Sequence, residues 1–163
     1  RLMEGYLALM AEVFDQIAAP PTHLFLQAGV GGLAGAAAAI ARMRWGDATR
    51  IIVVEPEVAP CLFESIRAGQ PVATSGPASA MGRLDCKVPS LIALKGLARD
   101  ADDFITITEA EGQAGADLCA GHGLVSTPSG AAGVAGLLAA RGRLGLGAQS
   151  RALVILSERA DAA

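Results

Sequence analysis

The feature that most constrains the fold is a glycine-rich turn between a short apolar run and an alanine-rich segment. Residues 23–27 (HLFLQ) predict a strand, and residues 32–45 predict a helix. Gly29, Gly31 and Gly32 stand where the one passes into the other. Glycines let the main chain approach an anion closely, and the unpaired amides and the dipole of the first helical turn then bind it. The sequence therefore predicts a phosphate-binding site at this turn.

Strands and helices alternate along the chain. Further strands are predicted at 51–55, 104–108 and 151–157, and further helices at 2–17, 58–68, 90–98 and 109–120, with an irregular segment at 69–89. Residues 126–141 are predicted to begin with a turn of small residues and to become helix. The segment 51–55 (IIVVE) is β-branched and apolar, as in a strand buried on both faces. This order predicts an α/β fold, a three-layer and mainly parallel sheet with helices on both faces. Ligands of such sheets bind beyond the carboxyl ends of the strands.

Composition and charge limit the partners of the chain. Its 163 residues are 52% hydrophobic and carry a net charge of -3 at pH 7. Such a chain suits one globular α/β domain, which we place over residues 1–163. The interspersed charges do not predict binding to nucleic acid or to an anionic membrane surface. The longest apolar stretch, residues 33–41, is far shorter than the roughly 20 residues that cross a bilayer.

The cysteines and histidines predict neither a disulfide framework nor a metal site. Cys61, Cys86 and Cys119 are odd in number, far apart and without a CxxC pair, which is typical of reduced thiols in a cytoplasmic protein. His23 and His122 lack metal-ligand spacing with each other and with any cysteine. We therefore expect a cytoplasmic protein without a bound metal.

The glycine turn has a second interpretation. Residues 29–34 (GVGGLA) fit G-x-G-x-x-A, and Glu55 ends the next strand, where a dinucleotide-binding domain places its ribose-binding acid. Pro56 and Glu57 follow Glu55 at once, and a second turn of small residues lies near the end of the chain. Both features count against a dinucleotide. A nucleotide- or phosphate-binding module without catalytic activity stays open as an alternative.

Three segments, in this order, carry a resemblance to a known family. They are residues 22–35 (THLFLQAGVGGLAG), 54–56 (VEP) and 81–86 (MGRLDC). Together they resemble the C-terminal half of the diaminopropionate ammonia-lyases, which belong to the tryptophan synthase β-like pyridoxal phosphate enzymes of fold type II. The glycine loop alone indicates only this superfamily, which includes serine and threonine dehydratases. The QAGVG form of the loop and the MxxLDC segment indicate the ammonia-lyases.

The resemblance implies a cofactor, a reaction and partners. The chain would be a partial large domain that binds pyridoxal 5'-phosphate. The parent enzyme would convert 2,3-diaminopropionate, a small amino acid, to pyruvate and ammonia, and a related serine or threonine dehydratase is the alternative. The resembled family forms homodimers, so we expect one here. Because the chain starts at Arg1, directly in a predicted helix, we expect it to be a fragment of a longer protein whose N-terminal half is absent.

The resemblance also assigns the cofactor contacts. The loop whose amides bind the cofactor phosphate corresponds to Gly29, Val30, Gly31, Gly32 and Leu33. Ser157, at the end of the last predicted strand, resembles the residue that hydrogen-bonds the pyridine nitrogen. A hydroxyl there leaves that nitrogen largely unprotonated, which suits β-elimination. Residues 126–130 (STPSG) resemble a Ser-Gly turn near the cofactor, with Pro128 where the family has glutamate.

Three further side chains are candidates for the site. Asp85 could act as an acid or base near the substrate amino group, although a loop aspartate also commonly forms turns. Glu55 and Ser129 could line the site, and Glu55 could equally do no more than end its strand. The three aspartates of residues 100–103 predict a solvated turn.

Lysine is scarce, and this bears on catalysis. Pyridoxal phosphate enzymes need a lysine that forms a Schiff base with the cofactor. The chain contains only Lys87 and Lys95, neither in a Ser-x-Lys context, and both are predicted to be solvated surface residues. In the resembled family the Schiff-base lysine lies in the N-terminal half. We therefore expect this chain alone to be catalytically inactive.

Overall fold

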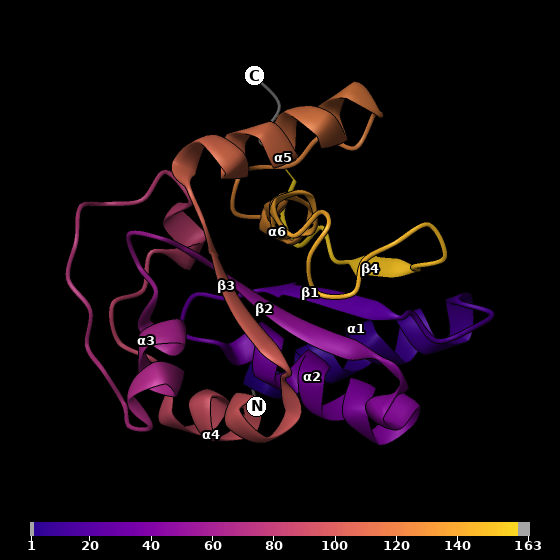
Figure 1. Ribbon diagram of the computed structural model, residues 1–163, viewed down its shortest axis with the longest axis horizontal. Coiled ribbons are helices and arrows are strands. Elements are labelled where there is room, and N and C mark those ends of the chain that lie inside the picture. The colour runs from indigo at the N-terminus through magenta and orange to yellow at the C-terminus, as the bar shows by residue number, and fades with distance from the viewer. Residues whose placement is uncertain (1, 160–163) are drawn as a thin grey trace.

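The computed structural model describes residues 2–159 of the chain as a parallel sheet between two layers of helices (Figure 1). The sheet has four strands in the order β3-β2-β1-β4, and each neighbouring pair is parallel. The strands are β1 His23–Gln27, β2 Arg50–Pro56, β3 Asp103–Ile107 and β4 Ala152–Val154. The helices are α1 Leu2–Gln16, α2 Gly32–Trp45, α3 Cys61–Ala68, α4 Leu91–Asp100, α5 Glu109–Gly121 and α6 Ala132–Ala139, with the 3-10 turns η1 Gly46–Ala48 and η2 Gly82–Leu84. The predicted α/β fold is confirmed.

The two central strands are buried on both faces, and their side chains alternate between two cores. Leu24, Leu26, Ile51 and Val53 pack with α1, α2, α3 and α4. Phe25, Ile52 and Val54 pack with α6 on the opposite face, and α5 lies over α6 (Figure 1). Alternation follows from the two-residue period of a strand. The alanines of α2 keep that helix close to the sheet, and they stabilise it because alanine has the highest helix propensity.

The boundaries of several predicted elements differ from the structure. The strand predicted at 151–157 ends at Val154, because β4 pairs with β1 over only three residues and the Ile155 carbonyl accepts a side-chain amide instead. The helix predicted from 58 begins at Cys61, after a turn in which the Ala59 amide donates to the Pro56 carbonyl, and Pro60 is its N-cap residue. The segment 126–141, predicted to start as a turn of small residues and to become helix, does so: residues 128–131 form a turn and α6 begins at Ala132 and ends at Ala139. The irregular segment 69–89 is confirmed, with the short turn η2 inside it.

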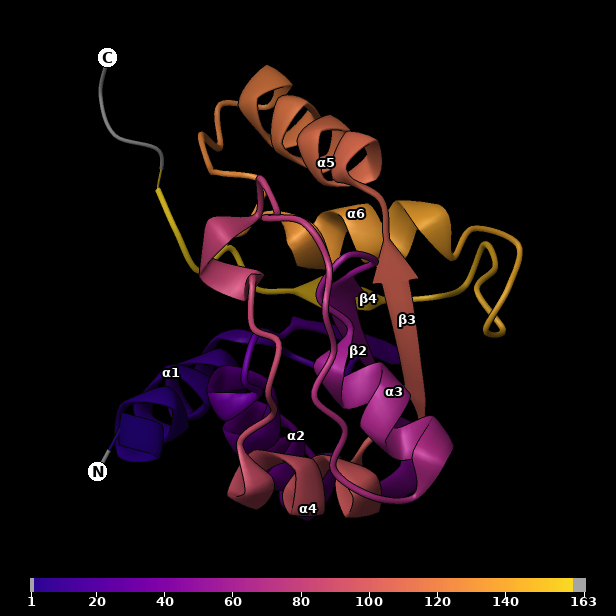
Figure 2. The ribbon, with the colours of Figure 1, turned by 90° about the vertical axis from the view of Figure 1, so that its left-hand side faces the viewer.

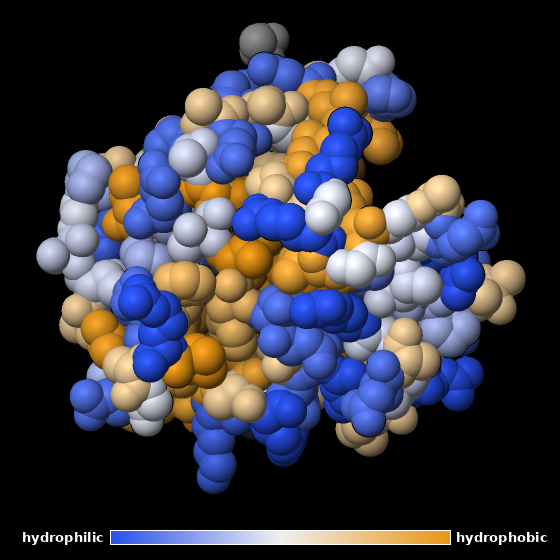
Figure 3. Space-filling view, viewed as in Figure 1, coloured by the Kyte–Doolittle hydropathy of each residue, from blue (hydrophilic) through white to orange (hydrophobic). Residues whose placement is uncertain are grey.

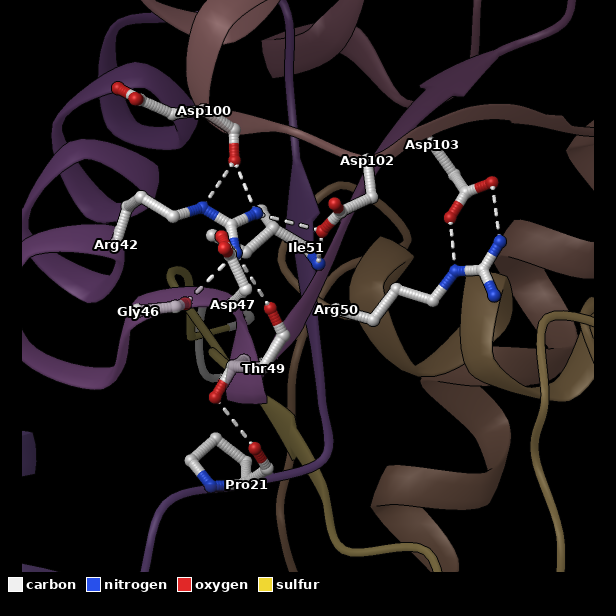
Figure 4. Close-up of polar contacts among 10 residues, drawn as sticks. All are labelled: Pro21, Arg42, Gly46, Asp47, Thr49, Arg50, Ile51, Asp100, Asp102 and Asp103. Carbon is white, nitrogen blue, oxygen red and sulfur yellow. Dashed lines mark hydrogen bonds and ion pairs between the residues drawn. The ribbon is translucent and has the colours of Figure 1, made fainter.

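The solvated turn predicted at residues 100–103 is wrong, because its aspartates join two strands to a helix (Figure 4). Arg42 of α2 donates to the Asp100 carbonyl from Nε and Nη2, at 3.1 and 2.7 Å, and to the Asp102 carboxylate at 2.8 Å. Asp102 also accepts the Ile51 amide at 2.7 Å. Asp103 forms a two-pronged ion pair with Arg50 at 2.6 and 3.1 Å. These side chains tie the start of β3 to β2 and α2.

The surface on the β3 side mixes apolar and hydrophilic side chains. Figure 3 shows apolar side chains gathered between the α5–α6 layer and the helices below, crossed by hydrophilic ones. Within residues 2–159 no helix combines the length and the apolar character that a membrane crossing requires.

Candidate functional site

The loop that follows β1 opens onto a cavity of about 630 Å³ at the carboxyl ends of the strands. In Figure 2 this end of the sheet faces the viewer. The cavity is walled by α1, by residues 28–33, by the η2 turn with Cys86, and by residues 156–158 with Ser129. This is the position at which parallel α/β sheets bind their ligands. All five loop residues predicted to hold a phosphate, together with Ser129 and Ser157, line it.

The main-chain amides of the loop have no oxygen partner within residues 2–159, although the Val30 amide contacts the Cys86 sulfur. The regular pairing of the strand ends when the Ala28 amide donates to the Val54 carbonyl at 2.9 Å. Helical hydrogen bonding starts at Gly35, whose amide donates to the Gly31 carbonyl at 2.7 Å. Between these points, no amide of residues 29–33 donates to an oxygen in the described chain from 2 to 159. Unpaired amides at a helix N-terminus attract an anion, so the residues fit a phosphate group.

Two glycines of the loop are required by its shape. Gly31 has a φ of 96°, a left-handed conformation that L side chains rarely adopt. A Cβ on Gly29 would lie 2.9 Å from the Cys86 sulfur and 3.0 Å from the Arg83 carbonyl oxygen. The loop is therefore pressed between α4 and the η2 segment, and its residues line the cavity.

A buried glutamine connects the loop to the C-terminal segment. Gln27, the last residue of β1, is 2% exposed. Its Nε2 donates to the Ser157 hydroxyl and to the Ile155 carbonyl, both at 2.8 Å, and lies 3.2 Å from the Gly130 carbonyl. Ser157 itself is exposed and lines the cavity, so its oxygen is held in place while its proton stays available.

The Ser-Gly turn lies beside the cavity and is bound to Glu158. The Ser126 hydroxyl donates to the main-chain carbonyl of Glu158 at 2.6 Å, and the Thr127 hydroxyl donates to its carboxylate. Arg83 of η2 donates from Nε to the same carboxylate at 2.9 Å. Its main-chain amide contacts the Ser129 hydroxyl oxygen at 3.3 Å. A carboxylate thus stands at the edge of the cavity although Pro128 supplies none, and it comes from Glu158.

Asp85 does not line the cavity. Its carboxylate lies 2.6 Å from the Lys87 Nζ and accepts the Ser79 amide at 3.3 Å. The hydrogen bond from Lys87 is the main reason why the pKa of Asp85 is lowered. Lys87 also donates to the carbonyls of Val58 and Pro77, at 2.8 and 3.0 Å. The prediction of a solvated Lys87 is wrong, because this side chain closes the irregular segment 69–89 onto the loop after β2.

Glu55 also lies outside the cavity walls. It is 1% exposed, and its two carboxylate oxygens accept the amides of Leu62 and Phe63 at 2.8 and 2.7 Å. It thereby satisfies the first turn of α3, which a carboxylate stabilises. Burial raises the pKa of Glu55 to about 7, against the lowering effect of the two amides. Among the two roles left open for Glu55, this geometry gives it the structural one.

Three residues of the site were not predicted from the sequence: Gln27, Arg83 and Glu158. Gln27 stood inside the motif that carried the resemblance, yet its role depends on partners more than 100 residues away. Arg83 and Glu158 belong to segments without regular periodicity. Glu158 could have been found from position 128, where proline replaces the family's glutamate and a carboxylate from another segment would be needed.

The fold and the site define a parallel α/β domain with an anion-binding loop at the carboxyl end of its first strand. Comparison with known proteins gives its family. A sequence profile of the pyridoxal-phosphate dependent enzymes matches residues 1–158. The chain belongs to this family, whose cofactor is pyridoxal 5'-phosphate.

Curated relatives and solved structures agree with this assignment. The chain is similar to the diaminopropionate ammonia-lyase of Salmonella typhimurium, with 37% identity over 114 residues, 64% of this chain and 28% of the relative. It is similar to that of Escherichia coli K12, with 32% identity over 149 residues, 85% of this chain and 37% of the relative. The chain thus spans about a third of their length.

A solved structure of the Escherichia coli diaminopropionate ammonia lyase matches 96% of this chain and 44% of its own, with a TM-score of 0.83 and 28% identity. A threonine deaminase from T.th. matches 99% of this chain and 58% of its own, with a TM-score of 0.87 and 22% identity. The second likeness shows the fold alone. Both confirm the predicted architecture of a fold type II enzyme.

Proposed function

We propose that this chain is the C-terminal part of a pyridoxal phosphate-dependent ammonia-lyase that converts 2,3-diaminopropionate to pyruvate and ammonia. The observation that carries the proposal is the row of amides in residues 29–33, which have no oxygen partner within residues 2–159 and belong to a loop that lines a cavity together with Ser157. The relatives named diaminopropionate ammonia-lyase support the substrate.

Within this proposal each part of the site has a task. The amides of residues 29–33 bind the cofactor phosphate, and the dipole of α2 favours its charge. The Ser157 hydroxyl contacts the pyridine nitrogen. When bound, pyridoxal phosphate supplies the electron sink that makes removal of an α-proton feasible. Glu158 and Ser129 line the same cavity, and Arg83 holds the Glu158 carboxylate in place.

The complete enzyme needs more than this chain holds. Neither Lys87 nor Lys95 lines the cavity, and we propose that the Schiff-base lysine is supplied from outside residues 2–159. The coding sequence upstream of Arg1 tests this directly, and a lysine in a Ser-x-Lys motif is expected there. We also propose a homodimer, as in the resembled family, and sedimentation equilibrium of the protein measures this.

Thermal unfolding separates the cofactor proposal from the dinucleotide alternative. A ligand that binds only the folded state raises its melting temperature, and the rise grows with the logarithm of the ligand concentration divided by Kd. We expect pyridoxal phosphate to raise the melting temperature and NAD to leave it unchanged. Protection by NAD alone would contradict the proposal. With the full-length gene product, pyruvate release from diaminopropionate, compared with serine and threonine, decides between the ammonia-lyase and a dehydratase.

A further inference from the structure

We infer that Gln27 is a positioning residue, which fixes the Ser157 hydroxyl so that it donates its proton into the cavity, toward an unprotonated pyridine nitrogen. This inference rests on the proposed function, because it takes Ser157 as the contact to the cofactor ring. Gln27 is thereby added to the site, and the Ser157 hydroxyl proton is given a direction that Ser157 alone does not fix.

The orientation of the Gln27 amide is set by main-chain carbonyls. Carbonyl oxygens accept hydrogen bonds and cannot donate them. Because the Ile155 carbonyl lies at 2.8 Å and the Gly130 carbonyl at 3.2 Å, the end of the side chain that faces them must be the NH2 group. The reverse orientation would place the carbonyl oxygen of the Gln27 side chain against two others.

The direction of the Ser157 proton follows from this orientation. The NH2 group lies 2.8 Å from the Ser157 oxygen, so that oxygen is the acceptor of the pair. A serine hydroxyl has one proton, and it is not used in the bond with Gln27. Since Ser157 is exposed at the cavity wall, its proton is directed to a ligand atom that accepts. A pyridine nitrogen accepts only when it carries no proton of its own.

Without the amide, the hydroxyl would have a competing partner. The Ile155 carbonyl would then lack its donor, and a buried acceptor without a partner is costly. The Ser157 hydroxyl shares the Gln27 amide with this carbonyl and follows it by two residues, so it is a group that could then donate to it. Its proton would turn away from the cavity. By donating to the Ile155 carbonyl, Gln27 leaves the Ser157 proton available to a ligand.

The Oε1 atom of the Gln27 side chain indicates that this residue does more than fill space. Oε1 is buried and has no hydrogen-bond partner in the part of the chain that the structure describes. It faces Gly133, where an added Cβ would lie 3.0 Å away. A residue kept only to fill this space would be apolar and would avoid the unpaired acceptor. The amide is therefore explained by its NH2 group, which donates to the Ile155 carbonyl and to the Ser157 oxygen.

The test compares four proteins with two ligands. The proteins are the unaltered chain, Gln27→Met, Ser157→Ala and the double variant. The ligands are pyridoxal phosphate and its 1-deaza analogue, in which a CH replaces the ring nitrogen. Dissociation constants from thermal protection give a preference ratio for each protein. We expect the unaltered chain to prefer pyridoxal phosphate, and Ser157→Ala to lose that preference by roughly tenfold, the effect of one hydrogen bond.

The Gln27→Met protein decides the inference. If Gln27 acts through Ser157, this variant loses the same preference, binds the 1-deaza analogue as before, and adds nothing in the double variant. If it keeps the preference that Ser157→Ala loses, the inference is overturned and the proposed function stands. If neither ligand protects the unaltered chain at millimolar concentration, the proposed function fails and the inference with it.

A second measurement needs no variant. The 15N resonance of labelled pyridoxal phosphate bound to the unaltered chain reports the protonation of its ring nitrogen. A hydrogen-bonded, unprotonated nitrogen supports the inference. The large upfield shift of a pyridinium overturns it, and this holds even if Gln27→Met fails to fold.

Discussion

Gly31 and Ala93 are in close contact, and a Cβ placed on Gly31 would lie 3.0 Å from the Cβ of Ala93. The contact joins the anion-binding loop to α4, and the Ser90 amide reinforces it by donating to the Val30 carbonyl at 3.0 Å. The shape of the loop therefore depends on a helix that begins about 60 residues later in the chain. Packing, in addition to glycine content, holds the loop at the cavity wall.

The first prediction concerns this contact. Gly31→Ala forces a side chain onto a φ of 96° and crowds both Ala93 and Leu62. The free energy of unfolding should fall by about 1–3 kcal/mol. Protection by pyridoxal phosphate should be lost as well, because the loop amides move. Urea unfolding with and without the cofactor measures both effects.

Gly32→Ala is the matched control. A Cβ there would meet only the Tyr6 ring, at the ordinary distance of 3.8 Å, and the residue is the first of α2. Because alanine favours a helix over glycine by about 1 kcal/mol, stability should be kept or slightly raised. A loss of similar size in both variants would show that the backbone conformation of Gly31 is not the cause.

The second prediction concerns Arg42, whose side chain is 18% exposed. Arg42→Met keeps much of the apolar stem and removes the donors to the Asp100 and Thr49 carbonyls and to Asp102. The free energy of unfolding should fall by roughly 2–4 kcal/mol, because the carbonyls of two buried residues, Thr49 and Asp100, lose their partner together. Arg67→Met is the control, since Arg67 pairs with Glu64 on the surface and such a pair contributes about 0–1 kcal/mol. Equal destabilisation of the two variants in chemical unfolding would contradict the role given to Arg42.

The third prediction follows from the raised pKa of Glu55. Burial raises the pKa from 4.5 to about 7, so the folded protein keeps this proton at a pH where the unfolded chain has lost it. Between pH 4.5 and 7 the folded state binds more protons, and its stability must fall as pH rises. This part of the stability is complete below pH 4.5 and lost above pH 7, and it amounts to roughly 3 kcal/mol at most.

Glu55→Gln removes that titration. The melting temperature of the unaltered protein should therefore fall between about pH 5 and 7.5 more steeply than that of Glu55→Gln. Glu57→Gln, at the exposed position two residues on, should keep the slope of the unaltered protein. Parallel curves for the unaltered protein and Glu55→Gln would show that the carboxylate is ionised throughout and that its amide bonds outweigh burial.

Much of the fold could be predicted because it depends on local patterns. The strand at 23–27, the glycine turn and the helix at 32–45 each follow from neighbouring residues, and all three have the predicted bounds. The position of the loop then follows from the parallel sheet, whose carboxyl ends meet at one edge. These steps need no knowledge of which distant residues touch.

The rest depends on pairs that are far apart in sequence. Arg42 and Asp102 are 60 positions apart, and Gln27 and Ser157 are 130 apart. No periodicity connects such residues, and a charged or amide side chain looks the same in sequence whether it is solvated or buried against carbonyls. Lys87 shows the consequence, since composition alone predicted a surface residue and the structure gives it three oxygen partners.

The last prediction concerns the two lysines. Lys87 is held by Asp85 at 2.6 Å and by two carbonyls. Lys95 lies on the exposed side of α4. Neither side chain lines the cavity. Borohydride reduction of the chain after incubation with pyridoxal phosphate should therefore leave no saturable adduct, even where the cofactor raises the melting temperature. Peptide mass spectrometry locates any adduct, and the Lys87→Arg/Lys95→Arg protein, which has no lysine, gives the background. A stoichiometric adduct on Lys87 would require its nitrogen to leave Asp85 and both carbonyls and reach the cavity, and it would refute the view that the Schiff-base lysine is supplied from outside this chain. Binding without an adduct separates the two functions of the site, because the loop amides and Ser157 then hold a cofactor that this chain cannot link covalently.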